Sequence, residues 1–141
     1  MKFTKIFMSG LLALCVSNQL LAGSIPEGEK VSINGYAAKS MIQALENTGV
    51  KGNNFVVGSI DCFQSVAYHP VAHCTVYSDE GTSMQASGKD SMTLFNILGM
   101  NGAYMPTGYG VRRASVVNVE CSVDTSVCSF NKFNLKVSPG V

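Results

Sequence analysis

The spacing of apolar residues along this chain predicts two amphipathic helices. After Gly35, and again after Gly88, apolar side chains recur at intervals of three and four residues, which is the period of an α-helix with one buried face. The predicted core positions are Ala38, Met41, Ile42 and Leu45 in the first helix, and Leu94, Phe95 and Leu98 in the second. Each helix is therefore expected to pack one face against the rest of the domain.

The residues at the ends of these two stretches are typical of helix caps. Asn34 and Ser87 each stand directly before a stretch and can accept a hydrogen bond from a free backbone N–H of the first turn. Asp90 stands three residues after Ser87, so the pair resembles a capping box with Asp in place of Glu. Gly49 and Gly99 are the predicted stops, because glycine adopts the left-handed conformation without a steric cost.

Segments of β-prone composition lie around both helices, and several alternate between apolar and polar residues. The predicted strands are Glu29–Ile33, Asn54–Cys62, Cys74–Ser78, Thr82–Ala86, Ser115–Val123 and Val127–Val137. In the last of these, the apolar phase changes between Phe130 and Phe133, which predicts a bulge or bend. Residues 63–73 are expected to connect the second strand to the third.

The order strand, helix, strand, strand occurs in both halves of the chain, which predicts an internal repeat. Asn34-Gly35 and Ser87-Gly88 begin equivalent helices 53 residues apart, and two cysteines follow each helix. We assign the two units to residues 29–81 and 82–137. The predicted fold is α+β: an antiparallel sheet with two helices on one face, built from two tandem βαββ units.

The first 22 residues have the composition of a secretory signal peptide. Lys2 and Lys5 precede a mostly apolar segment, Ile6–Val16, and Leu20-Leu21-Ala22 supplies a small residue at the expected cleavage site. The apolar segment is shorter than the roughly 20 residues that span a bilayer. We therefore expect residues 23–141 to form a single secreted or periplasmic domain, stabilised by disulfides.

Four cysteines remain after this leader, an even number that favours two disulfides in an oxidising compartment. Three pairings are open from the residues alone. The repeat favours the pairs within each unit, Cys62–Cys74 and Cys121–Cys128, each joining adjacent strands. No Cys-x-x-Cys spacing occurs, which argues against a zinc site.

Charge and motif content argue against several classes of function. Without Lys2 and Lys5, the 10 basic residues become 8, against 9 acidic, and this near balance argues against nucleic acid or an anionic membrane as partner. The chain has no nucleophile elbow, zinc-protease motif or phosphate-binding loop. Asp61 is a candidate titrating carboxylate, but the sequence places no second acid to act with it. We expect a protein that is not an enzyme and needs no cofactor.

The segment 99–113 is the predicted binding site. Cys62 and Cys121 are 59 residues apart whereas the helix starts are 53 apart, so about six extra residues lie in this segment. It is rich in glycine, and its side chains of the kinds enriched at protein interfaces are Tyr104, Met105, Tyr109, Arg112 and Arg113. The other interpretation is an ordinary glycine-rich crossover whose tyrosines cover the sheet edge. The 63–73 connection, with Phe63, Tyr68 and His69, adds a second contact if both segments lie at the same end of the sheet.

These features predict a secreted or periplasmic protein-binding module that presents a rigid loop to its partner. The partner class that fits best is an extracytoplasmic enzyme or toxin. The protein would then be an inhibitor or immunity protein acting on a protease, a cell-wall hydrolase or a toxin. Self-association into a homodimer or a surface assembly through exposed strand edges is a further alternative.

His69 and His73 support a different function, that of a periplasmic protein that binds a metal ion or small ligand. Neutral imidazoles are common ligands of zinc and copper. Pro70 prevents the regular helix that would place two histidines four residues apart on one face, so both are also explained as solvated residues of a connection. An enzyme of unfamiliar type that uses Asp61 or a histidine is a third alternative.

Overall fold

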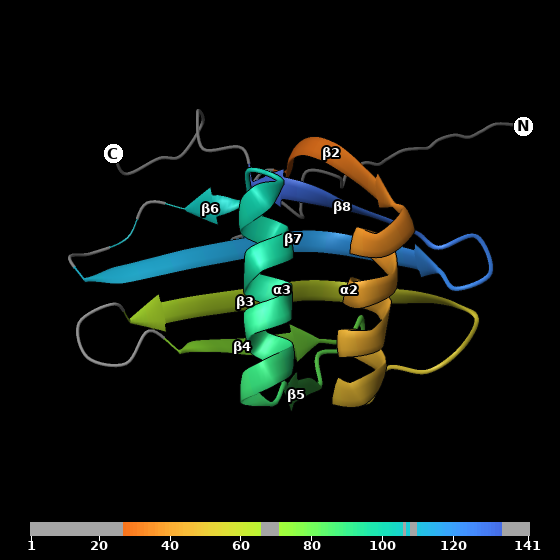
Figure 1. Cartoon of the computed structure of the whole chain (residues 1–141), viewed down its shortest axis with the longest axis horizontal. Coiled ribbons are helices and arrows are strands. Elements are labelled where there is room, and N and C mark those ends of the chain that lie inside the picture. Colours follow the sequence, from red (N-terminus) through yellow and green to blue (C-terminus); the bar gives the residue numbers. More distant parts are fainter. Residues whose placement is uncertain (1–26, 66–70, 106, 108–109, 134–141) are drawn as a thin grey trace, which may run out of the picture. The chain divides into compact units, whose positions relative to one another are not determined.

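Two helices lie side by side across one face of an antiparallel sheet, as Figure 1 shows. This computed structural model describes residues 27–65, 71–105, 107 and 110–133. The helices are α2 (Gly35–Thr48) and α3 (Gly88–Met100). The strands are β2 (Glu27–Asn34), β3 (Asn54–Ser65), β4 (Ala72–Tyr77), β5 (Ser83–Gln85), β6 (Tyr104–Met105), β7 (Val111–Ser122) and β8 (Val127–Phe133). The predicted α+β class, with an antiparallel sheet and two helices, is confirmed.

The strand order of the sheet is β2-β8-β7-β3-β4-β5, and the short strand β6 pairs with the beginning of β7. At its centre the long antiparallel pair β3–β7 runs from Asn54 opposite Ser122 to Ser65 opposite Val111. The first strand of the described chain, β2, pairs with the last, β8, and β5 pairs with β4. The sequence predicted a strand at each of these places except β6.

The predicted faces of the two helices form the core together with one face of the sheet. Every core position that the apolar spacing predicted is buried. These side chains pack with apolar residues of the four central strands, among them Val57, Ile60, Val76, Val116 and Phe130. Within the described part of the chain, no helix is long and apolar enough to cross a membrane.

Both helices begin after the predicted N-cap residue, but the two caps differ. The Ser87 hydroxyl accepts a hydrogen bond from the Asp90 backbone N–H at 3.2 Å and donates one to the Asp90 carboxylate at 3.0 Å, a variant of the predicted capping box. Asn34 makes no side-chain capping bond. Gly49 ends α2 with a φ of 129°, as predicted.

Gly99 is not a helix stop, and that prediction is wrong. It lies in the last turn of α3, which continues to Met100 and is capped by Asn101. A Cβ atom added at Gly99 would lie 2.3 Å from the ring of Tyr104, where the atoms would overlap. The close approach of β6 to the helix therefore requires glycine here, rather than a left-handed backbone.

Two disulfides connect neighbouring strands. Cys62 is bonded to Cys74 between β3 and β4, and Cys121 is bonded to Cys128 between β7 and β8. In each pair, the two residues stand directly opposite each other in the strand register. All four are buried in the core. Both pairings that the repeat favoured are confirmed.

The central strands extend further than the sequence predicted, and two connections are correspondingly shorter. β3 continues to Ser65 and β4 begins at Ala72, so the residues at both ends of the predicted 63–73 connection are paired strand. β7 begins at Val111 instead of Ser115. Five residues of the predicted 99–113 binding segment, at 104–105 and 111–113, are therefore hydrogen-bonded strand.

The bend predicted in the last strand lies instead in its two neighbours. In β8, burial alternates from Val127 to Phe130, with Cys128 and Phe130 buried, and residues 131–133 are all half-buried. Register shifts occur in β2 and in β7, where Asn118 has a φ of 53°. Because a bulge in one strand shifts its pairing with the next, the irregular apolar phase of β8 pointed to a bulge but placed it in the wrong strand.

Candidate functional site

The sheet has two unlike faces, and the face without helices is a candidate binding surface. Side chains of β3 alternate, so Cys62 and Gln64 are buried under the helices, whereas Asp61 and Phe63 lie on the opposite face. Among the described elements, none covers that opposite face (Figure 1). We refer to it as the helix-free face.

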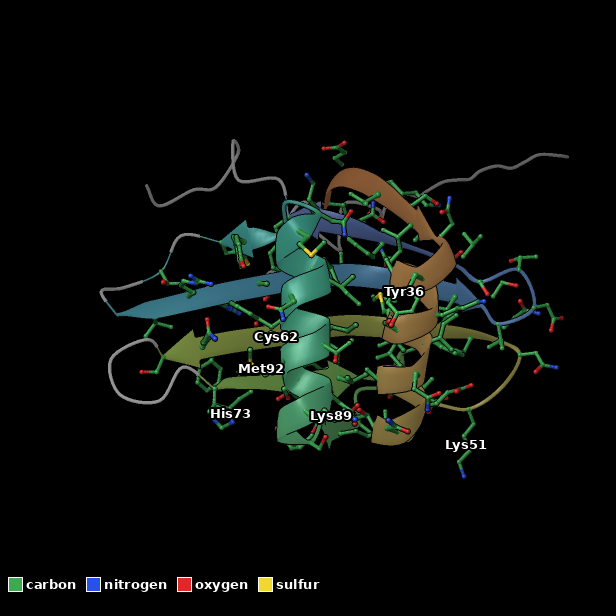
Figure 2. All side chains as sticks on the ribbon, viewed as in Figure 1. Tyr36, Lys51, Cys62, His73, Lys89 and Met92 are labelled. Carbon is green, nitrogen blue, oxygen red and sulfur yellow. A yellow bond between two sulfur atoms is a disulfide. The ribbon has the colours of Figure 1, made fainter. Side chains whose placement is uncertain are left out.

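One row of side chains on the helix-free face runs across four strands. Met105 of β6, Arg113 of β7, Phe63 of β3 and His73 of β4 stand opposite one another in the strand register. The rings of Phe63 and His73 are stacked with centroids 5.3 Å apart. Figure 2 labels His73 on β4. Phe63 is 46% exposed although it is a large apolar side chain. The row therefore places aromatic, thioether and cationic groups together at the surface.

Arg113 is already bound to a carboxylate on this face. Its Nε donates to Asp61 Oδ1 at 2.8 Å, and the Ser115 hydroxyl donates to the same oxygen. The side chains of Arg113 and Asp61 are 43% and 33% exposed, so solvent screens the pair and its contribution to stability is small. Its main effect is to fix the Arg113 side chain and to balance its charge.

Arg112, the preceding residue, lies on the other face, beside α3. Its guanidinium carbon is 5.7 Å from the ring centroid of Phe95 and 5.5 Å from that of Tyr104. The centroids of these two rings are themselves 5.5 Å apart. Phe95 is completely buried, whereas Tyr104 and Arg112 are both exposed. Tyr104 and Arg112 therefore form the outer layer over the Phe95 ring.

A hollow of about 350 Å³ lies at the β6–β7 pair. It is lined by Tyr104, Met105, Val111, Arg112 and Arg113. The hollow is a surface depression and not an enclosed cavity, so it suits a protruding group of a macromolecule better than a small molecule that must be largely buried.

Both connections singled out by the sequence join the sheet at the same end. Ser65, the last residue of β3, stands opposite Val111, the first residue of β7. The chain that leaves β3 and the chain that enters β7 are therefore neighbours. This arrangement meets the condition under which the 63–73 connection can add to contacts made by the 99–113 segment.

The structure brings the described candidate residues to one end of the sheet but divides them between its two faces. Met105 and Arg113 lie on the helix-free face, whereas Tyr104 and Arg112 lie on the side of the helices. The remaining candidates, which lie outside the described residues, are Tyr68, Tyr109 and His69.

The sequence named Phe63 as a contact residue of the 63–73 connection, whereas the structure places it within strand β3. Phe63 follows Asp61 in the phase of β3 that faces away from the helices, where an aromatic side chain has no core to enter. The predicted strand ended at Cys62, so this phase was not followed to Phe63. The alternation, continued by one more residue, places Phe63 on the exposed face of the strand, and the strand register places it beside His73.

Neither a metal centre nor a relative identifies the function of this site. The described residues contain no group of three or more His, Cys, Asp or Glu side chains that could hold a metal ion. Comparison with protein-family models, curated proteins and solved structures finds no match for this chain. The function is therefore inferred from the chemistry and position of the residues themselves.

Proposed function

We propose that this chain is an exported, non-catalytic protein-binding module whose contact surface is one end of the sheet. We refer to this surface as the binding end and define it by Phe63, His73, Tyr104, Met105, Arg112 and Arg113. The observation that carries the proposal is that these surface side chains, from four strands, gather where two connections enter the sheet side by side. Aromatic residues, Met and Arg are enriched at protein interfaces.

We also propose that the domain consists of two tandem βαββ units, β2-α2-β3-β4 and β5-α3-β7-β8. The pairing of strands is reciprocal, which supports this interpretation: the first strand of each unit pairs with the last strand of the other. Each unit also has one disulfide between its last two strands. The two hairpins meet at the β3–β7 pair in the middle of the sheet.

The differences in length between the two units support the choice of the binding end. The disulfide-bonded cysteines are separated by 12 residues in the first unit and by 7 in the second. Residues 49–53 link α2 to β3, whereas the longer segment 101–110, which includes β6, links α3 to β7. Both longer segments enter the sheet at the end where Ser65 faces Val111. Since the other unit forms the same elements with less chain, the extra length serves something other than the scaffold.

An inhibitor or immunity protein for an extracytoplasmic enzyme or toxin is the role we propose within this class. Two disulfides are typical of proteins that work in oxidising compartments. The Cys62–Cys74 bond joins β3 to β4 directly beside the Phe63–His73 pair, so it holds these two contact residues in place. A surface that is fixed before binding loses little conformational entropy on association, which suits tight inhibition.

The proposal is tested by partner capture with a matched pair of variants. The purified protein, with both disulfides oxidised, is used as bait in extracytoplasmic extracts of the source cell and its competitors. Phe63→Ser removes an exposed ring from the binding end. Val56→Ser is the control, because Val56 is also exposed on the helix-free face of β3. The two positions are about 23 Å apart at roughly 3.3 Å per residue.

We expect wild type and Val56→Ser to retain the same enzyme or toxin, and Phe63→Ser to lose it. The melting temperatures of both variants are compared with wild type to exclude misfolding. Titration of the retained enzyme with wild-type protein should then lower its activity. Retention that is equal for all three proteins would place the contact surface elsewhere. Retention of a protein whose activity is unaffected would restrict the function to binding.

A further inference from the structure

The two neighbouring arginines of β7 differ in whether a carboxylate of this chain pairs with them. Arg113 is paired with Asp61 at 2.8 Å on the helix-free face. Arg112 faces the opposite side, and in the described part of the chain it forms no ion pair with a carboxylate. A partner that binds Arg113 has to compete with Asp61, whereas Arg112 presents a positive charge that no described carboxylate balances.

From this difference, and resting on the function proposed above, we propose that Arg112 binds a carboxylate of the partner at the β6–β7 hollow. The group that occupies the hollow is an Asp or Glu side chain, or a C-terminal carboxylate, next to an apolar group of the partner. Charge complementarity requires the carboxylate. Val111, which is 39% exposed, and Met105 line the same hollow and account for the apolar neighbour.

The Arg112 guanidinium is held in position before a partner arrives. Its carbon lies 5.5 and 5.7 Å from the centroids of Tyr104 and Phe95, within the range of cation–π attraction. Tyr104 is itself seated directly over Gly99 on α3. A guanidinium that rests on aromatic faces still has N–H groups free at its edge, and these match the two oxygens of a carboxylate. A rigid donor pair loses less entropy on binding than a freely rotating side chain.

The competing explanation is that Arg112 only shields the Phe95 ring from water. That role needs the length of the side chain and not its N–H groups, because the aliphatic part of an arginine covers apolar surface. Arg112→Met separates the two roles, since methionine keeps an unbranched chain over Phe95 but has no donor. Arg112→Lys keeps the charge but loses the two-pronged donor geometry.

A direct test uses benzoate as the probe and nuclear magnetic resonance on the ¹⁵N-labelled, disulfide-bonded protein. We expect saturable shifts in the millimolar range for the Arg112 Nε–H and the amides of Val111 and Tyr104. Benzamide, which has the same shape without the charge, should produce none. The shifts should vanish in Arg112→Met and weaken in Arg112→Lys. Lys51→Gln is the charge control, because Lys51 lies before β3 at the other end of the sheet and should leave the shifts unchanged (Figure 2).

Equal shifts with benzoate and benzamide, benzoate shifts that survive in Arg112→Met, or no shifts with either compound would overturn the inference. Partner capture separates this inference from the proposed function. We expect Arg112→Met to bind the partner at least tenfold more weakly than wild type, with a smaller dependence on salt. Capture that is lost in Phe63→Ser but unchanged in Arg112→Met would reject the role of Arg112 and still support the binding end as the contact surface. Benzoate binding at Arg112 without capture of any partner would reject the proposed function instead.

Discussion

The close approach of Tyr104 to α3 makes Gly99→Ala an informative substitution. In an ordinary helix, replacing glycine by alanine stabilises the protein by up to about 1 kcal/mol, because the backbone loses less freedom on folding. Here the new Cβ would lie 2.3 Å from Tyr104 Cζ and 2.4 Å from its hydroxyl oxygen. The ring cannot stay where it is, so it has to swing away from the helix.

The magnitude follows from the contacts that this movement breaks. The aromatic pair of Tyr104 with Phe95 contributes about 0.5–1.5 kcal/mol, and the contact with Arg112 about 0.5–1 kcal/mol. Loss of burial for a half-buried ring costs about 1–2 kcal/mol. Against the gain of about 1 kcal/mol in helix propensity, we expect a net loss of about 1–3.5 kcal/mol. For a domain of about 119 residues, each kcal/mol lowers the melting temperature by roughly 4 °C.

Urea unfolding followed by circular dichroism measures the change. Gly88→Ala is the matched control, because it lies at the first position of the same helix, where an added Cβ meets nothing within 4 Å. This control should be as stable as wild type or slightly more stable. In a Tyr104→Ala background the clash is absent, so Gly99→Ala should become neutral or stabilising, a coupling that a double-mutant cycle detects. A Gly99→Ala protein as stable as wild type would refute the steric argument.

The remaining predictions concern the helix caps and the disulfides. Ser87→Ala should lower the free energy of unfolding by about 1 kcal/mol, because it removes the bond to the Asp90 N–H. Asn34→Ala should have a smaller effect, because Asn34 makes no side-chain capping bond; equal losses in urea unfolding would contradict this difference. Cys121→Ala should leave one free thiol, at Cys128, and an intact bridge between β3 and β4 in a peptide map. A mixed bridge between the two hairpins would contradict that pairing.

Local patterns were reliable in most places where the interaction they encode is itself local, and the Asn34 cap is the exception. The three-and-four spacing identified both helices and their buried faces, because helical periodicity is a property of a single segment. The cap at Ser87 and the stop at Gly49 follow from contacts within one turn. Both disulfides were assigned because each cysteine pair belongs to one hairpin.

The errors occurred where the partner of a residue is distant in the sequence. The glycine-rich segment 99–113 was predicted as a loop, yet Met105 and Arg113 are strand residues paired across the β6–β7 ribbon, and Arg113 also pairs with Phe63 of β3. Gly99 was interpreted as a helix stop because the ring that excludes a side chain there belongs to the following strand. Composition predicts neither the β6–β7 pairing nor the contact of Tyr104 with Gly99, because both depend on which distant segment packs beside these residues.

The sequence by itself thus determined the two helices, the position of most strands, the parity of the cysteines and the chemistry available near residues 104–113. Only the tertiary structure decided that Arg112 and Arg113 face opposite sides of the sheet, one over aromatic rings and the other against Asp61. The physical reason is that pairing with neighbouring strands fixes the direction of each side chain in a strand. Because β7 starts at Val111, four residues earlier than predicted, Arg112 and Arg113 are strand residues whose side chains must point to opposite faces, which a loop would not require.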